Sequence, residues 1–343
     1  MNTRLCKIDP HRPDESVLRE ASAVLHCGGL VAIPTETVYG LAANALDPQA
    51  VLGIYAAKHR PADNPLIVHV SSVEMAKRYV TEWPDAAQKL ADAFWPGPLT
   101  MILPKRDVIP PEVTCGGPSV ALRFPSHPAA RAVIEASGLP LAAPSANLSG
   151  SPSPTCAAHV MHDFDGAIDM VIDGGQCACG VESTVVTLCT TPPRLLRPGF
   201  VTVEELRGVL GEVEVDPAVF HALKDGQPVA SPGMKYRHYA PKARLTLLDG
   251  TLAACAAYVN ARAAEHPTVL CFEDDEPAFS VDTLVYGREG DPESQAARLF
   301  DVLRTLDERG VTLAYARCPA REGVGMAVWN RILRAAQFVV VKL

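Results

Sequence analysis

Short apolar runs that end at proline or glycine alternate along the chain with stretches whose apolar residues recur at helical spacing. Gly29–Ile33 is such a run, and the proline that follows it predicts that this buried strand ends in a turn. Pro48–Lys58 has near-helical apolar spacing and a proline in its first turn, which predicts a helix. Pro65–Val70 then predicts a second strand. Polar residues gather where these elements meet, so we expect functional groups at the element ends.

The same patterns predict an α/β domain that extends to residue 210. Helices are expected at Ser16–Cys27, Val73–Val80, Asp85–Phe94, Pro128–Ser137, Ala157–Asp163 and Val203–Leu210. Strands are expected at Leu99–Pro104, Ser119–Pro125 and Met170–Asp173, in the stretch that begins at Gly180, and in a run that ends at Arg197.

From residue 243 onward, strands and helices alternate regularly, which predicts an open, mostly parallel, Rossmann-like α/β domain. We therefore divide the chain into a domain at residues 1–210, a linker at 211–242 and a smaller domain at 243–343. The expected strands of the smaller domain are Leu245–Leu248, Thr268–Phe272, Thr283–Tyr286, Val311–Arg317 and Phe338–Lys342. Its expected helices are Leu252–Glu265, Pro292–Glu308 and Gly325–Ala336.

The looser stretch between the domains contains Ser231–Pro241, which is dense in cationic and aromatic residues. Planar, donor-rich side chains of this kind suit a ligand, and a compact loop can close over a site as a lid. A spacer that packs its aromatic residues against one domain would have the same composition. The sequence leaves both interpretations open.

Length and charge narrow the classes of function. A chain of 343 residues can form two domains with cores of their own, and a net charge of −8 disfavours broad binding to nucleic acid or anionic lipid. No apolar run is long enough to span a membrane, and the N-terminus has no signal-peptide core. The ten cysteines are scattered, which favours reduced, packed thiols over a metal or redox site. We expect a cytoplasmic protein.

No Gly-Lys dipeptide is present, so the chain has no P-loop, and it also lacks the nucleophile-elbow serine motif. What recurs is a cation or hydroxyl at the end of an expected strand or helix, where α/β domains bind ligands. Catalysis by positioning and charge neutralisation fits such residues better than a covalent nucleophile does. Each residue alone is typical of a surface or ion-paired group, so only their joint placement supports a site. They are Thr37, Lys58, Arg60, His69, Arg123, Ser145, Ser183, Arg197 and Tyr236.

Short motifs of polar and small residues recur along the chain at Pro34–Leu41, Lys58–Arg60, Asn64–Leu66, Trp95–Thr100, Ala143–Asn147, Gly180–Thr184 and Leu196–Gly199. In order and spacing, these motifs resemble those of the YrdC family. The aromatic-rich linker and the α/β tail resemble the long form of this family, the two-domain threonylcarbamoyl-AMP synthases, so the likeness covers almost the whole chain. Two departures are mild, because Ala42 replaces a frequent glycine and Ser119 keeps the hydroxyl of a common threonine.

The resemblance implies an enzyme that joins L-threonine, bicarbonate and ATP into threonylcarbamoyl-AMP and releases pyrophosphate. Other proteins would then transfer the threonylcarbamoyl group to tRNA, so downstream transfer proteins and a weak contact with tRNA are expected. The implied fold is a YrdC-like twisted α/β sheet domain with a large cationic cleft. Mg²⁺ would be carried into this cleft with ATP.

Matched motif by motif, the resemblance assigns L-threonine to Thr37, His69, Arg123, Ser183 and the backbone at Ala143. It assigns ATP to Lys58, Arg60, Asn64, Ser119, Ser145, Ser153, Arg197 and Tyr236, with Lys58 and Arg60 as catalytic residues. The carboxylate of threonine, a carbamate and a triphosphate are all anions, so the cleft must offset their mutual repulsion. We therefore expect Arg60, Arg123 and Arg197 to share one hollow.

Two alternatives remain. Because YrdC-like clefts are cationic, the domain could be a non-catalytic RNA-binding module, although the net acidity counts against this. The carbamoyl-transfer role of related domains in hydrogenase maturation resembles larger chains with zinc-finger-like cysteine pairs, which this sequence lacks.

Overall fold

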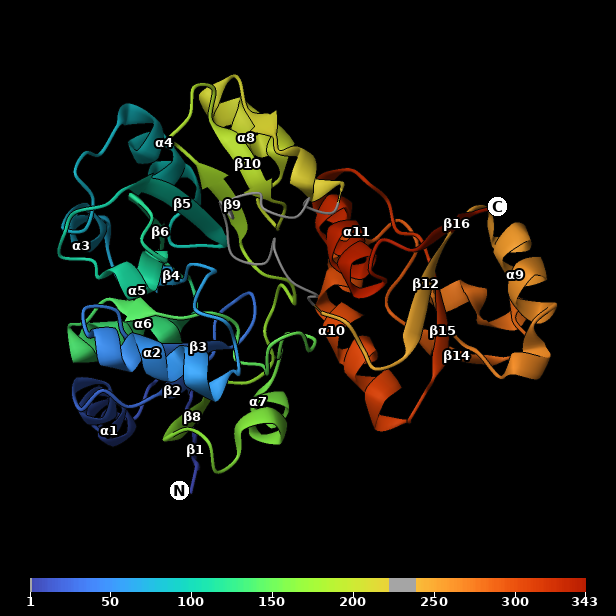
Figure 1. The fold of residues 1–343 in the computed structure, drawn as a ribbon, viewed down its shortest axis with the longest axis horizontal. Helices are drawn as coiled ribbons and strands as arrows, with labels where there is room; N and C mark the ends of the chain where they lie inside the picture. Colours follow the sequence, from blue (N-terminus) through green and yellow to red (C-terminus); the bar gives the residue numbers. More distant parts are fainter. Residues whose placement is uncertain (1, 222–238) are drawn as a thin grey trace.

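The computed structural model describes residues 2–221 and 239–343, and each of these two parts contains one β-sheet (Figure 1). Most of the predicted lid at Ser231–Pro241, including Tyr236, lies outside the described residues. None of the helices in the described parts combines the length and the apolar character needed to cross a bilayer.

Residues 2–221 form an eleven-stranded mixed sheet with the strand order β1-β8-β2-β3-β7-β4-β6-β5-β9-β10-β11. Its strands are β1 (Arg4–Lys7), β2 (Val31–Ile33), β3 (Gly40–Asn44), β4 (Ile67–His69), β5 (Leu99–Pro104), β6 (Ser119–Arg123), β7 (Leu141–Ala142), β8 (Met170–Asp173), β9 (Thr184–Thr187), β10 (Arg194–Arg197) and β11 (Glu214–Val215). Its helices are α1 (Glu15–His26), α2 (Pro48–Ala57), α3 (Val73–Lys77), α4 (Asp85–Phe94), α5 (Pro111–Thr114), α6 (Pro128–Ser137), α7 (Ala157–Phe164) and α8 (Val203–Leu210), followed by the 3₁₀ turn η1 (Pro217–Val219).

Strand β3 is an element that the sequence analysis missed. Its residues, Gly40-Leu41-Ala42-Ala43-Asn44, include no β-branched side chain, so the local preference for a strand is weak. It forms because β2 pairs with it antiparallel, with Val31 opposite Ala42, and both residues are fully buried. Helix α3 is also shorter than predicted: it ends at Lys77, and Val80 instead forms a β-bridge with another segment.

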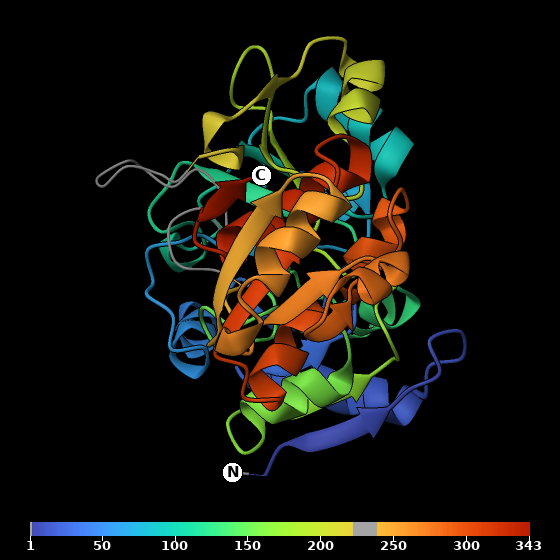
Figure 2. The ribbon, with the colours of Figure 1, turned by 90° about the vertical axis from the view of Figure 1, so that its right-hand side faces the viewer.

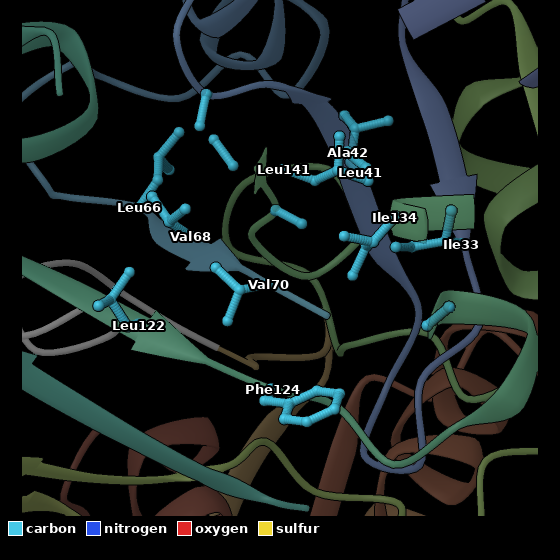
Figure 3. Packing of buried hydrophobic residues seen from close by; sticks show 14 of the residues in the cluster. Ile33, Leu41, Ala42, Leu66, Val68, Val70, Leu122, Phe124, Ile134 and Leu141 are labelled. Atoms are coloured by element: carbon cyan, nitrogen blue, oxygen red, sulfur yellow. The ribbon is translucent and has the colours of Figure 1, made fainter. Parts of the chain in front are cut away.

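The core of this domain holds the strands in fixed positions. Figure 3 shows Ile33, Val68, Leu122 and Leu141, which come from β2, β4, β6 and β7, together with Ile134 of α6. All five side chains are fully buried. Because apolar burial is the main term that favours folding, these strands form a rigid platform for the polar groups at their ends.

Residues 239–343 form the predicted open parallel α/β domain, with the strand order β14-β13-β15-β12-β16 and parallel pairing throughout. Figure 2 shows this domain in front of the N-terminal domain. The predicted helix Leu252–Glu265 is interrupted and ends in a 3₁₀ turn. The elements are β12 (Arg244–Asp249), α9 (Leu252–Asn260), η2 (Ala263–Glu265), β13 (Thr268–Cys271), η3 (Glu273–Ala278), β14 (Asp282–Val285), α10 (Pro292–Glu308), β15 (Leu313–Arg317), α11 (Gly323–Ala335) and β16 (Val340–Lys342).

Helices α10 and α11 lie on the side of the C-terminal sheet that faces the N-terminal domain (Figure 1). Arg304 of α10 donates two hydrogen bonds, of 3.0 and 2.8 Å, to the carboxylate of Asp163. Arg331 of α11 donates one of 2.8 Å to Glu182. All four side chains are more than nine-tenths buried. Buried ion pairs therefore join the two domains directly.

The described part of the predicted linker also contacts both domains. Strand β11 pairs in parallel with β10 and so extends the N-terminal sheet. The turn η1 follows it, and Asn330 of α11 donates a 2.8 Å hydrogen bond to the carbonyl of Val219. This segment therefore packs between the sheet and the C-terminal helix.

A substitution at Gly180 would test the packing of α10 against the N-terminal domain. It has a φ of +76°, and an added Cβ would lie 2.3 Å from the carbonyl oxygen of Ala296 in α10. We expect Gly180→Ala to lower the free energy of unfolding by about 2 kcal/mol or more, because it strains the backbone and displaces α10. Urea denaturation measures the loss.

The matched control is Gly208→Ala in α8, where an added Cβ meets no atom within 4 Å. This substitution should be neutral or slightly stabilising. Equal urea midpoints for Gly180→Ala and the unmodified protein would contradict the interface geometry.

Candidate active site

Strand directions bring four of the predicted site residues to one edge of the N-terminal sheet. Strands β4 and β6 run parallel and pair His69 with Arg123, the last residue of each strand. Strand β10, which ends at Arg197, runs antiparallel to β9. Strand β9 is parallel to β5, and β5 is antiparallel to β6, so β10 runs in the same direction as β6. The end of β10 and Ser183, just before β9, therefore lie at the same edge. Ligands of α/β domains commonly bind at such an edge.

These four residues line one cavity, and Thr37, Ala143 and Ser145 join them from the β2–β3 connection and the loop after β7. The cavity holds about 640 Å³, including its opening to solvent. The lining confirms the expected convergence of three cations in one hollow: Arg60, Arg123 and Arg197.

Arg123 and Glu36 form a buried ion pair of 2.8 Å at this cavity. Burial acts to raise the pKa of Glu36, but the adjacent Arg123 guanidinium outweighs it and holds the pKa below its usual value. Burial and the same positive charge lower the pKa of His69 to about 3, so its imidazole is neutral at neutral pH. The Nε of Arg123 has no hydrogen-bond partner among the described residues. A buried, unpaired guanidinium donor fits an anionic ligand.

Arg197 is held against the strand that begins after Ser183. It donates from Nε to the Ser183 carbonyl at 3.0 Å and from Nη2 to the Ser183 hydroxyl at 3.1 Å. The hydroxyls of Ser183 and Thr100 are 2.8 Å apart. Burial lowers the pKa of Arg197 to about 10, so the guanidinium remains charged at neutral pH. The result is a fixed, desolvated cation beside a hydroxyl.

Arg60 follows α2 and is held by the next loop. Its Nη2 donates to the carbonyl of Asn64 at 2.8 Å, and its guanidinium lies over the ring of Tyr55, 5.7 Å from the centroid. Within the described residues, the Nε of Arg60 and both side-chain polar atoms of Asn64 are buried without a hydrogen-bond partner. Because Arg60 lines the cavity, its Nε can donate to a molecule bound there, whereas Asn64 is fully buried and outside the cavity lining.

A second cavity adjoins the first, because Pro65 lines both. Ser119 lies in the second cavity and not in the first, together with Thr114, Ala121 and Leu196. The unpaired amide of Asn64 immediately precedes the shared proline. A ligand that extends from one cavity into the other would reach both Ser119 and the arginines.

Lys58 does not line either of these cavities. It is 2% exposed, and its ammonium donates to the carbonyls of Ser145 and Asn147. Burial, reinforced by the nearby charge of Arg60, lowers the pKa of Lys58. Its observed contacts therefore hold the loop that carries Ser145, instead of presenting the ammonium to the cavity.

The cavity lining includes Glu182 and Tyr239, which the sequence analysis did not assign to the site. Glu182 lies in the same motif as Ser183, but a carboxylate was not expected in a site that binds anions. Glu182 accepts a 2.5 Å hydrogen bond from the hydroxyl of Ser153. Ser153, a predicted nucleotide-binding residue, is fully buried and lies outside the cavity lining. Tyr239 lies three residues after Tyr236 in the aromatic-rich segment and lines the cavity. Its place in that segment was the available signal.

Among residues 2–221 and 239–343, no cluster of three or more histidine, cysteine, aspartate or glutamate side chains could hold a metal ion. The cations that line the first cavity are instead guanidinium groups. A nucleotide-borne Mg²⁺ is compatible with this arrangement, because Mg²⁺ commonly keeps several waters and is bound largely through substrate phosphates.

Comparisons with known proteins cover almost the whole chain. A Sua5/YciO/YrdC family model described as "Telomere recombination" matches residues 23–199, and a model described as "Threonylcarbamoyl-AMP synthase, C-terminal domain" matches residues 201–337. The threonylcarbamoyl-AMP synthase of Pyrococcus abyssi is 43% identical over 97% of both chains. That of Bacillus subtilis is 44% identical over 95% of this chain and 94% of its own. The solved structure of P. abyssi Sua5 complexed with L-threonine has a TM-score of 0.93 and 42% identity, and the match covers 99% of this chain and 100% of that one.

The Glu36–Arg123 pair predicts a pH dependence of stability. Because the pKa of Glu36 is lowered on folding, its contribution is present above the unfolded pKa of about 4.3 and is lost as the pH falls through the lower folded value. Glu36→Gln should cost about 3–5 kcal/mol of unfolding free energy at pH 7, since it leaves Arg123 buried and unpaired. It should also flatten the acid limb of the stability profile.

The control is Glu135→Gln, which removes a solvent-exposed carboxylate 3.8 Å from Arg131. Its effect should stay below about 1 kcal/mol. Urea titrations at several pH values measure both variants, and an unchanged acid limb in Glu36→Gln would contradict the assigned ion pair.

Proposed function

This chain belongs to the threonylcarbamoyl-AMP synthase family, and we propose that it carries out the family's reaction in the two adjoining cavities. The enzyme makes threonylcarbamoyl-AMP from L-threonine, bicarbonate and ATP and releases pyrophosphate, for threonylcarbamoyladenosine formation in tRNA. The main observation in support of this location for the active site is that Arg60, Arg123 and Arg197 line one cavity. Each substrate carries an anionic group, and desolvated guanidinium groups offset the repulsion between these groups.

We assign the threonine end of the cavity to the region around Arg123. The carboxylate of threonine accepts from the guanidinium of Arg123, whose Nε is otherwise unpaired among the described residues. His69 is neutral there and can accept or donate a hydrogen bond without adding charge. Thr37 and Ser183 complete the subsite through their hydroxyls, and Ala143 through its backbone carbonyl, because its N–H donates to the carbonyl of Ile67.

The nucleotide lies across the two cavities in this proposal. Its phosphates contact Arg60, Arg197 and Ser145 in the first cavity, and its nucleoside end extends past Asn64 toward Ser119. Lys58 acts by fixing the loop of Ser145, and Ser153 acts by fixing Glu182. The role of Tyr236 as a cover over the nucleotide remains a prediction outside the described residues.

The proposed chemistry needs no covalent enzyme intermediate. Bicarbonate loses hydroxide to give carbon dioxide, and the threonine amine attacks its carbon. The proton that leaves the nitrogen combines with that hydroxide as water, and the product is a carbamate. A carbamate oxygen then attacks the α-phosphorus of ATP in line, and the bond to pyrophosphate breaks. Arg60 and Arg197 hold the phosphates and offset the charge that collects during this step. Mg²⁺ bound to ATP supplies further neutralisation.

The non-catalytic alternative receives no comparable support. An RNA-binding module needs an exposed basic surface, whereas the three converging arginines are largely withdrawn into a cavity and the net charge is −8. A weak contact with tRNA and the downstream transfer proteins remain proposals about partners. A cytoplasmic location is likewise a proposal, supported by cysteines none of which forms a disulfide within residues 2–221 and 239–343.

Pyrophosphate release tests the proposed function. The purified chain is incubated with MgATP, L-threonine and bicarbonate, and each of the last two is omitted in turn. We expect release only in the complete mixture, because the nucleophile is a carbamate made from both. Release that continues without threonine or without bicarbonate would refute the proposed reaction.

Substitution of the two motif cations tests the nucleotide subsite. Arg60→Ala removes a cation from the cavity, and Lys58→Ala releases the loop that carries Ser145, so each should reduce pyrophosphate release to background while the fold survives. The exposed residues Arg19 and Lys89 provide matched controls, whose alanine variants should retain activity. Activity at the unmodified level in either motif variant, with circular dichroism unchanged, would remove that residue from the site.

Arg123→Lys tests the threonine subsite separately. Lysine keeps the charge but loses the planar, bidentate donor pair, so we expect the KM for threonine to rise by about tenfold or more. The KM for ATP should change much less. A larger change for ATP than for threonine would reverse the assignment of the two subsites.

A further inference from the structure

Arg331 reaches the wall of the cavity from the other domain. It lies on α11, and its side chain is fully buried. Its Nε donates to the Glu182 carboxylate at 2.8 Å and its Nη1 to the Pro198 carbonyl at 2.8 Å. Its guanidinium carbon also lies 5.9 Å from the centre of the Tyr239 ring. Arg331 therefore touches two residues that line the cavity and a third that follows Arg197.

The carboxylate of Glu182 is unfavourable in a cavity that binds anions, because like charges repel. It lines the same cavity as the three converging arginines, and its side chain is only 8% exposed. Burial acts to raise its pKa, but Arg331 and then Arg197 outweigh that effect and keep the pKa below its usual value. The carboxylate is therefore ionised at neutral pH, with Arg331 as its ion-pair partner and Arg197 as a second cation that lowers its pKa.

The hydrogen bonds of Glu182 and Arg197 go to different partners. Glu182 accepts from Arg331 and from Ser153, whereas the hydrogen bonds described for Arg197 go to the carbonyl and hydroxyl of Ser183. Among residues 2–221 and 239–343, Arg197 therefore has no direct carboxylate contact that would compensate its guanidinium charge. Loss of Arg331 would leave a buried carboxylate without its ion-pair partner, which is costly, and Arg197 is the nearby cation that could replace it.

We propose that Arg331 of the C-terminal domain is a positioning residue for the synthase reaction, which holds Glu182 away from Arg197 and so leaves Arg197 for the phosphates of ATP. This gives the C-terminal domain a direct part in nucleotide affinity. The inference rests on the proposed function, because it takes Arg197 to be a phosphate ligand.

The experiment is a double-mutant cycle on ATP affinity, measured by isothermal titration calorimetry with the full chain and a non-hydrolysable ATP analogue. Arg331→Met and Arg331→Gln remove the charge, and the second keeps a hydrogen-bond donor. Each should weaken analogue binding by about tenfold or more, within the usual range of coupling between sites. Arg331→Lys, which keeps the charge, should bind within about threefold of the unmodified protein. Threonine affinity should change by a smaller factor than analogue affinity.

The decisive variant adds Glu182→Gln to each neutral substitution. If the defect arises because Glu182 captures Arg197, removal of the carboxylate should restore most of the lost analogue affinity. A merely structural role for Arg331 would leave the double variants as weak as the single ones. The matched control is Arg317→Met, which removes a buried arginine that pairs with Asp275 inside the C-terminal domain. Its analogue affinity should be unchanged.

Three results would overturn the proposal. They are unmodified affinity in both folded neutral variants, no recovery on addition of Glu182→Gln, and failure of both neutral variants to fold with or without Glu182→Gln. Arg197→Met separates this inference from the function beneath it. If Arg197→Met binds the ATP analogue as tightly as the unmodified protein, the assignment of the nucleotide subsite is refuted. If Arg197→Met loses analogue affinity but the neutral Arg331 variants do not, only the positioning role of Arg331 is refuted.

Discussion

Crowding three guanidinium groups into a partly desolvated hollow is the constraint on which the rest of this structure depends. Like charges repel strongly where water is scarce, so each cation needs compensation that still leaves it able to bind an anion. Arg123 has a carboxylate on one side, Arg60 has carbonyls and an aromatic face, and Arg197 has the carbonyl and hydroxyl of Ser183. The compensation is partial in each case, and donors such as the Nε of Arg123 and Arg60 remain unpaired among the described residues.

The fold supplies this arrangement through strand direction and through the second domain. The last residues of β4, β6 and β10 meet at one edge because these strands run the same way. The C-terminal helices then neutralise carboxylates behind that edge, Arg304 at Asp163 and Arg331 at Glu182. A domain that carries no cavity residue on its own strands thus affects the charge balance of the site.

Local signals in the sequence predicted much of the fold, and pairing over distance accounts for what they missed. Helix α8 has the predicted ends because Thr202 and Glu205 form a capping box within a few residues. Strand β3 was missed because its small residues become a strand only when β2 lies beside them. The parallel C-terminal sheet followed from regular alternation, which is a local pattern repeated along the chain.

The candidate site also contains both residues that the motifs predicted and residues that only contacts between distant parts of the chain reveal. Motif positions brought Arg60, Arg123 and Arg197 to one cavity as expected, whereas Lys58 was expected at the nucleotide and instead bonds the Ser145 loop. The contact between Glu182 and Arg331 joins residues 149 positions apart, so no spacing rule could indicate it. Tyr239 lines the cavity but was not singled out, because neighbouring aromatic residues in one segment look alike in sequence, and the prediction for Tyr236 lies outside the described residues.

The central claim is that this one hollow gathers both anionic substrates on separate guanidinium groups. A crystal structure of the chain with L-threonine and a non-hydrolysable ATP analogue tests it most directly. The account predicts the threonine carboxylate on Arg123 and the phosphates on Arg60 and Arg197, with the nucleoside extending toward Ser119. Either ligand bound outside these two adjoining cavities, or phosphates that contact none of the three arginines, would contradict it.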